Sequence, residues 1–189
     1  MKKMNKKGFT LVELLAVIVI LALIMAIAVV SMGGIMRSAR EGTFKDTALS
    51  IISGVKQQLA INGQMGNTET GYYFFQERLL EKGGKTSPLG GDILYVAAPD
   101  NTGKTATNGS TTKTVTQIGY NGIYKYTDTG APECNATSKS FVKAEYDDTN
   151  KIFKYSICLT AGAGNPYINA TETELLNTEN NTNVIKNNG

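Results

Sequence analysis

Hydrophobic and polar positions divide the chain into three stretches. Residues 14–36 carry no charged side chain, and a helix of this length would span roughly 34 Å, enough to cross a bilayer. Residues 37–61 are amphipathic, because apolar side chains recur there at three- and four-residue spacing. These apolar positions are Phe44, Ala48, Ile51, Ile52, Val55 and Leu59. The pattern predicts one long helix over about 10–62, ended by Asn62-Gly63.

Beyond residue 63 the chain is rich in Gly, Thr, Asn and Tyr, and short segments with strand character alternate with turn residues. We expect strands over 93–97, 114–120, 123–127, 140–146 and 151–159. Short helices are expected over 72–82 and 172–176, and the polar segment 99–113 is expected to be a loop. Three or four antiparallel strands packed on the amphipathic half of the long helix would make an α+β fold.

Two turns have clear local signals. Asn121-Gly122 lies between two strand candidates and predicts a type I′ hairpin, in which Tyr124 would face Gly119 and Tyr126 would face Gln117. The polar run 147–150 predicts a second turn between the last two strands.

Composition excludes many kinds of chemistry. The 189 residues include no histidine and no tryptophan, so Ser-His-Asp catalysis, Cys-His catalysis and His-ligated zinc or haem sites are absent. No other catalytic constellation is found, and we expect neither an enzyme nor a cofactor. The net charge of +3 depends on four of the 19 basic residues, which lie within the first eight positions: Lys2, Lys3, Lys6 and Lys7. The other 15 basic residues nearly balance the 16 acidic ones.

The amino-terminal segment could be an ordinary secretory signal, with a basic start, an apolar run and a cleavage site at Ala26-Ile27-Ala28. Two features count against this interpretation. The apolar run is longer than the usual signal core of about 7 to 15 residues. In addition, Glu13 lies at its entrance, where an ionised carboxylate is costly without a partner.

Residues 6–15, KKGFTLVELL, closely resemble the type IV prepilin signature. The resemblance covers the basic leader and the apolar helix, about residues 1–36, and GFTLVE at 8–13 is its most specific part. It implies that a prepilin peptidase removes the leader 1–8 by cutting after Gly8 and methylates the new amino group of Phe9. It also implies that Glu13 neutralises the Phe9 amine of a neighbouring subunit and so sets the register of each incoming helix.

The expected organisation therefore has four parts: the leader 1–8, a membrane-spanning and filament-core helix 9–36, the amphipathic half of the helix 37–62, and a β-rich head with a polar tail, 63–189. Lysines before the apolar run favour a cytoplasmic amino terminus. In the resembling family a proline commonly interrupts the apolar helix, whereas position 30 here is Val30. The adjacent Gly33 and Gly34 either weaken the helix or allow close approach of another helix.

Cys134 and Cys158 are the only cysteines, and both fall in the part expected outside the membrane. Alternation along 151–159 places Phe153, Tyr155 and Ile157 on one face and Cys158 on the other, which argues against a buried core thiol. We expect a disulfide between the two cysteines, with two free thiols as the alternative.

Other motifs are weak. Four Asn-X-Ser/Thr triplets begin at Asn108, Asn135, Asn169 and Asn180, and chance matches are expected in a chain this rich in Asn and Thr. Four acids could in principle bind Ca²⁺, but a solvated turn is expected instead: Asp147, Asp148, Glu172 and Glu174. DNA binding by a group of lysines is possible but unsupported, because acids interrupt them: Lys82, Lys85, Lys104 and Lys113.

Three functions are compatible with this sequence. The first is a structural pilin, anchored in the membrane by one helix and then polymerised into a surface type IV filament for adhesion, motility or DNA uptake. Its partners would be copies of itself, the prepilin peptidase and the assembly machinery. The second is a pseudopilin of a secretion or competence system. The third is a secreted or membrane-anchored binding protein. The sequence does not indicate a host or surface ligand.

Overall fold

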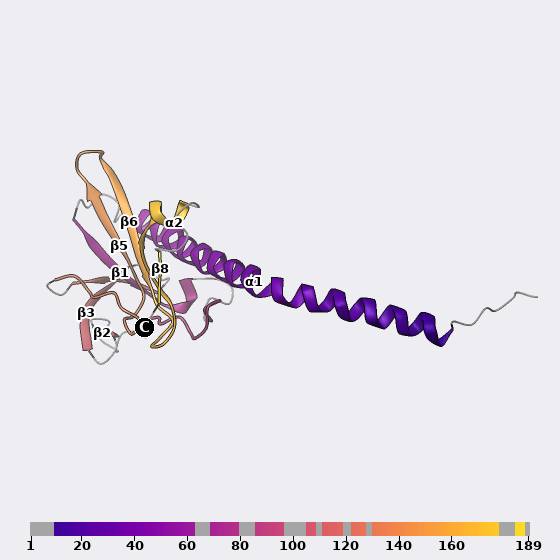
Figure 1. Ribbon diagram of the computed structural model, residues 1–189. Coiled ribbons are helices and arrows are strands. Elements are labelled where there is room, and N and C mark those ends of the chain that lie inside the picture. The colour runs from indigo at the N-terminus through magenta and orange to yellow at the C-terminus, as the bar shows by residue number, and fades with distance from the viewer. Residues whose placement is uncertain are drawn as a thin grey trace, which may run out of the picture. The chain divides into compact units, whose positions relative to one another are not determined.

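A computed structural model describes residues 10–62, 69–79, 86–96, 105–108, 111–118, 122–127, 130–177 and 184–187, with backbone alone for some of them (Figure 1). The chain forms two compact units, Met1–Ala39 and Arg40–Gly189, and each is described by itself. Helix α1, Leu11–Ile61, contributes to both units. The expected helix over 10–62 is confirmed to within one residue at each end, although Gly63 lies outside the described residues.

The second unit is built on an eight-stranded sheet in which every paired neighbour is antiparallel. The order is β2-β3-β4-β1-β5-β6-β7-β8, so the first strand of the chain lies in the middle of the sheet. The strands are β1 (Gly71–Phe75), β2 (Thr105–Asn108), β3 (Thr111–Ile118), β4 (Ile123–Tyr126), β5 (Phe141–Asp147), β6 (Ile152–Leu159), β7 (Tyr167–Thr171) and β8 (Ile185–Lys186). The α+β fold is confirmed, but the three or four strands expected from the sequence were too few.

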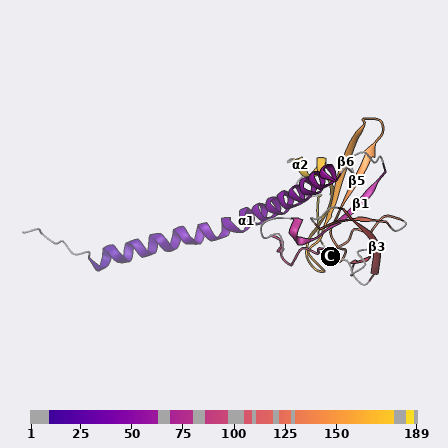
Figure 2. The same cartoon turned by 180° about the vertical axis from the view of Figure 1, so that it is seen from behind.

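One face of the sheet packs against the second half of α1, as Figures 1 and 2 show from opposite sides. All six apolar positions of the expected stripe, Phe44 to Leu59, are buried there. They meet alternate side chains of the sheet, among them Phe75 of β1, Val142 of β5 and Ile157 of β6. Burying side chains of this size typically stabilises a fold by about 1.5–3 kcal/mol each. The apolar stripe from Phe44 to Leu59 is therefore covered within the second unit.

The opposite face of the sheet also carries a buried cluster, which the sequence did not lead us to expect. Its side chains are Phe74, Val96, Tyr124, Tyr126, Phe141 and Cys158. Cys158 does face away from its neighbours Tyr155 and Ile157, as alternation predicted, but it is fully buried. The argument against a buried cysteine was wrong, because it assumed that only the face toward the helix is covered.

The helix expected over 72–82 was wrong. Residues 71–75 form strand β1, a single 3-10 turn follows at Glu77–Leu79, and 80–85 lie outside the described residues. Tyr73 and Phe75 enter the cluster under the helix, whereas Phe74 enters the cluster on the other face. The four consecutive aromatic residues are thus explained by a strand that is covered on both faces.

Two other expectations for the head were also wrong. Residues 93–96 form no strand; instead the backbone of Leu94 and Val96 bonds to three separate places, Thr160, Ser140 and Phe75. Ala97 lies outside the described residues. Much of the expected loop 99–113 is strand, because 105–108 and 111–113 belong to β2 and β3.

The strands around Asn121-Gly122 are confirmed, but their register was wrong. Tyr124 lies opposite Gln117 and Tyr126 lies opposite Val115, two positions away from the expected pairs. The last pair before the turn is Ile118 with Ile123, so four residues connect the strands where a type I′ hairpin has two. The turn at 147–150, the strands on either side of it and helix α2 (Glu172–Leu176) are as expected.

Candidate assembly segment

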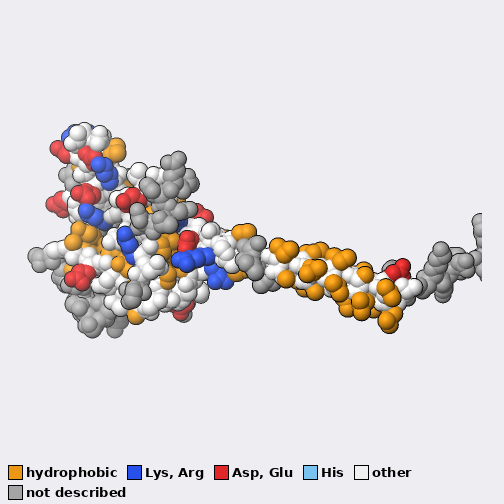
Figure 3. Space-filling view, in the orientation of Figure 1, with side chains coloured by type: hydrophobic (Ala, Val, Ile, Leu, Met, Phe, Trp, Pro, Cys, Tyr) orange, Lys and Arg blue, Asp and Glu red, His pale blue; other side chains and the backbone are white. Residues whose placement is uncertain are grey.

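The described part of the first unit is an apolar helix whose side chains are not buried by any residue that the structure describes. Leu11–Ala28 is long and apolar enough to cross a membrane, and none of it is buried. Leu23 is 63% exposed and Ile20 is 57% exposed. In Figure 3, hydrophobic side chains cover the visible surface of this segment, whereas the second unit mixes hydrophobic and charged side chains. A signal sequence near the amino terminus would also have this length and composition, so the helix alone does not establish a function.

Thr10 and Glu13 make a reciprocal cap at the start of this helix. The Glu13 carboxylate oxygen Oε2 accepts the backbone N–H of Thr10 at 2.8 Å and its hydroxyl at 2.9 Å. The Thr10 hydroxyl oxygen in turn accepts the backbone N–H of Glu13 at 3.3 Å. This arrangement is a capping box, which satisfies backbone donors that a helix leaves without partners at its start.

The cap fixes where the only acid of the apolar segment lies. Oε2 is held at the first turn of the helix, and the second carboxylate oxygen takes no part in the capping bonds. Such a carboxylate can still accept a bond from a cation that approaches the helix start. Sequence reasoning identified Glu13 but missed Thr10, although the pattern Thr-X-X-Glu before an apolar run is itself the signal of a capping box.

Residues 3–29 match the family model of the prokaryotic N-terminal methylation motif. The chain carries the class III leader of type IV pilins and pseudopilins. This motif implies processing by a prepilin peptidase. Gly8 and Phe9 lie outside the described residues, so cleavage between them remains a prediction. No curated protein and no solved structure matches the chain.

Behind the methylation motif, Gly33 and Gly34 lie within continuous helix. A Cβ atom added to either glycine would meet nothing within 4 Å. Nothing in the described chain packs on the two glycines. Both roles predicted for the pair, a weak point in the helix and a site of close helix contact, therefore stay predictions.

Cys134 and Cys158 are joined by a disulfide in the structure, with their Cα atoms 5.7 Å apart. The bond connects the irregular segment 130–140 to strand β6, on the sheet face that lies away from α1. Buried hydroxyls support the same connection: Thr160 donates from its hydroxyl to the Ser138 carbonyl and from its backbone N–H to the Ser140 hydroxyl.

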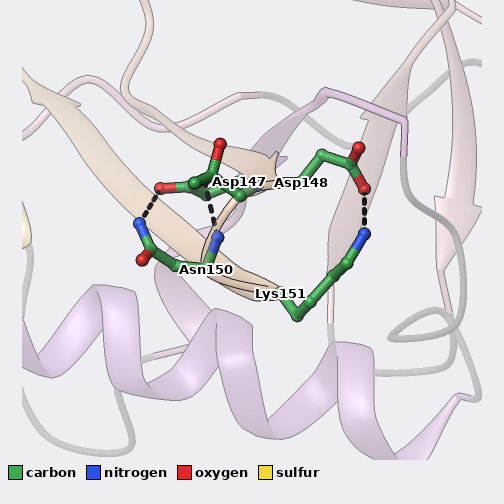
Figure 4. Close-up of polar contacts among 5 residues, drawn as sticks. Asp147, Asp148, Asn150 and Lys151 are labelled. Atoms are coloured by element: carbon green, nitrogen blue, oxygen red, sulfur yellow. Dashed lines mark hydrogen bonds and ion pairs between the residues drawn. The ribbon is translucent and has the colours of Figure 1, made fainter.

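The four acids named as possible calcium ligands lie in two separate places: Asp147 and Asp148 at the turn between β5 and β6, and Glu172 and Glu174 in helix α2. Asp147 closes the turn between β5 and β6 by accepting bonds from Asn150 (Figure 4) and from the backbone N–H of Thr149. It also pairs with Lys154. Hydrogen bonds from Lys154 and Asn150 hold the pKa of Asp147 well below its usual range. Glu174 caps α2, and bonds from Thr171 lower its pKa. Among the described residues no three potential metal ligands come together.

DNA binding by the group of four lysines stays a prediction. Lys82, Lys85 and Lys104 lie outside the described residues, and Lys113 is described by its backbone in β3.

Proposed function

We propose that this chain is a structural subunit of a type IV pilus, held in the membrane by its amino-terminal helix and then assembled through that helix into a filament. The carrying observation is the exposed apolar segment Leu11–Ala28, which lies within the methylation motif at 3–29. Many exposed leucine, isoleucine and valine side chains in one segment mark a surface that another molecule covers. The bilayer covers it before assembly, and neighbouring helices cover it in the filament.

The role proposed for Glu13 follows from the cost of an isolated charge. A carboxylate carried to the centre of a bilayer costs about 2.5–3.5 kcal/mol, and a lone charge buried among packed helices is also unfavourable. In the single chain Thr10 donates two hydrogen bonds to Glu13 but supplies no positive charge. Cleavage after Gly8 would create the amino group of Phe9, which supplies one. Pairing with that amine in a neighbouring subunit would fix the axial position of each helix.

The second unit supports a structural role outside the membrane. Its sheet is covered on both faces, and a disulfide joins the outer cover to β6. Disulfides persist in oxidising surroundings outside the cytoplasm. We therefore place the head on the filament surface and propose no enzymatic activity for it. Contacts with surfaces, with other cells or with DNA would be made by this head.

The first experiment is the intact mass and amino-terminal sequence of the protein in filaments sheared from its own cells. A chain that begins at N-methylated Phe9 in long surface filaments is the expected result. The same mature chain found in membranes, with no filament on the cell surface, would indicate a pseudopilin. A chain that begins after Ala28 would contradict the proposal and indicate an ordinary exported protein.

A Glu13→Ala variant tests assembly separately from processing. We expect normal cleavage after Gly8 but at least a tenfold loss of sheared filaments, since the attraction for the incoming amine is gone. Glu145→Ala removes an exposed carboxylate from strand β5 and is the matched control. Filaments of wild-type number and length in the Glu13 variant would contradict the role in register.

A further inference from the structure

The sequence contains the same triplet, Asn-Ala-Thr, at 135–137 and at 169–171. Both have the pattern of an acceptor for N-linked glycosylation, but the fold gives them different surroundings. We propose that Asn135 is a site of N-linked glycosylation and that Asn169 is not. The comparison is informative because the three residues are identical, so only their structural context and their neighbours differ.

In the triplet at Asn135, the Thr137 hydroxyl is hydrogen-bonded to the side chain of the acceptor asparagine. Oδ1 of Asn135 accepts the Thr137 hydroxyl at 2.8 Å and the Thr137 backbone N–H at 3.0 Å, and it also accepts the Ser138 hydroxyl at 3.0 Å. A backbone N–H can only donate, so this atom is the amide oxygen and the other is the nitrogen Nδ2. Nδ2 makes no hydrogen bond with any residue that the structure describes, and both Asn135 and Thr137 are exposed.

Three donors on the amide oxygen also favour the chemistry of transfer. They draw electron density from nitrogen toward oxygen, which makes an Nδ2 proton easier to remove. A sugar is then transferred from a lipid-linked diphosphate donor. The bond between Nδ2 and the anomeric carbon forms, the bond between that carbon and the phosphate oxygen breaks, and the lipid diphosphate leaves. The Nδ2 proton passes to a base of the transferase.

The backbone around Asn135 belongs to no strand, and the side chains of Asn135 and Thr137 are exposed although those of Ala136 and Ser138 are buried. The turn is closed by local bonds between Asn135 and Ser138. Glu133, two positions before Asn135, is exposed and places a carboxylate beside the acceptor. A basic pocket of the transferase could pair with that carboxylate.

The triplet at Asn169 has none of these features except exposure. Asn169 lies in β7, where its backbone pairs with Cys158 of β6, and β8 pairs on the other side of β7. The Thr171 hydroxyl serves Glu174 in the cap of α2, at 2.8 Å. The residue two positions before Asn169 is Tyr167. A transferase would have to pull β7 out of the sheet and open the cap of α2 to use this triplet.

The location of Asn135 is compatible with a filament subunit. Its neighbour Cys134 is bonded to Cys158, which belongs to the buried cluster on the sheet face away from α1. A glycan on Asn135 would therefore project from the side of the head that does not pack on the helix. It leaves the helix surface free for the contacts proposed for assembly.

The test is peptide mass spectrometry on the mature protein from its own cells, after reduction, alkylation and trypsin. Cleavage after Lys125 and Lys139 releases peptide 126–139, in which Asn135 is the only asparagine of an acceptor triplet. We expect a hexose- or hexosamine-containing mass on this peptide, and no sugar on Asn169 in peptide 155–186. Asn135→Gln and Thr137→Ala should each abolish the added mass, Thr137→Ser should retain it, and Asn169→Gln should leave it unchanged.

Two results would overturn the inference: peptide 126–139 carrying no sugar in any mature chain, or a sugar on Asn169 in its place. The same sample separates this failure from failure of the pilus proposal. An unmodified chain in filaments that begins at Phe9 contradicts the glycan alone. A glycosylated chain that begins after Ala28 contradicts the pilus alone.

Discussion

Helix α1 has two apolar stretches, one with exposed side chains and one with buried side chains. In Leu11–Ala28 no side chain is buried, whereas Phe44, Ile52 and Val55 are fully buried under the sheet. The two stretches differ in composition, because Glu13 is the only charged residue of Leu11–Ala28 whereas charged residues recur along 37–61. In the second stretch polar residues stand between the apolar ones, so its apolar side chains lie on one face of the helix and only that face has to be buried. The chain supplies that cover itself, whereas no described residue buries the first stretch, which in the proposed pilus subunit is covered by a bilayer or by other subunits.

The largest expected contrast is between core truncations in these two stretches. Phe44→Ala should lower the free energy of unfolding of the head by about 3–5 kcal/mol, because it removes a fully buried ring and leaves a cavity. Ile20→Ala removes a side chain that is 57% exposed and should leave the stability of the head unchanged. Urea unfolding of both variants in detergent, followed by circular dichroism, measures the difference. Equal losses would mean that the two stretches are not energetically separate.

Loss of the disulfide should be the next largest effect, and it too should be confined to the head. The bond closes a loop with a sequence separation of 24, which corresponds to about 3 kcal/mol in the loop-entropy estimate. A Cys134→Ser, Cys158→Ser double variant should unfold at lower urea but insert into membranes as the wild type does. Rapid alkylation of two thiols in the native wild-type protein would show that the bond is not formed.

The sequence predicted α1 well because its signals are long and agree with each other. A charge-free run and an amphipathic stripe join without a proline. The capping signal of Thr10 and Glu13, which the prediction did not use, agrees with them. The identity of Glu13 as the acid of the apolar segment came from the sequence, but its bonds to Thr10 came from the structure. The partner that we propose for it, the amino group of Phe9, belongs to another chain.

The head was predicted less well because its decisive contacts are non-local. The aromatic run before Gln76 fits either a short helix or a strand covered on both faces, and only the cluster around Phe74 distinguishes them. The register of β3 and β4 depends on the length of the connection, which Asn121-Gly122 alone does not fix. Polar strands such as Thr105–Asn108 read as loop because they lack an apolar face.

A smaller effect should come from the contact between α1 and helix α2. Lys56 Nζ lies 2.5 and 2.6 Å from the two carboxylate oxygens of Glu172 and 4.6 Å from the centre of the Tyr155 ring. Ion pairs and cation–π contacts at partly exposed sites typically contribute about 0.5–1 kcal/mol each. A double-mutant cycle with Lys56→Met and Glu172→Gln should therefore give a coupling energy of about 1 kcal/mol. A coupling energy near zero would mean that only the apolar contacts hold α1 on the head.

The smallest expected effect is a pH dependence of the stability of the head. Residues 14–36 contain no ionisable side chain, whereas the head contains many. Bonds from Lys154 and Asn150 lower the pKa of Asp147 in the folded protein, while the unfolded value is about 3.9. Folding thus favours the ionised form, and the contribution of Asp147 is complete above pH 5 and decreases as pH falls toward its lowered pKa. In urea titrations, the stability difference between wild type and Asp147→Asn should shrink between pH 5 and about pH 3. Asp148→Asn changes the neighbouring acid, which is 86% exposed and pairs with Lys151, and should remain close to wild type throughout. If both variants followed one pH curve, the bonds that close the turn would not contribute to the stability of the head.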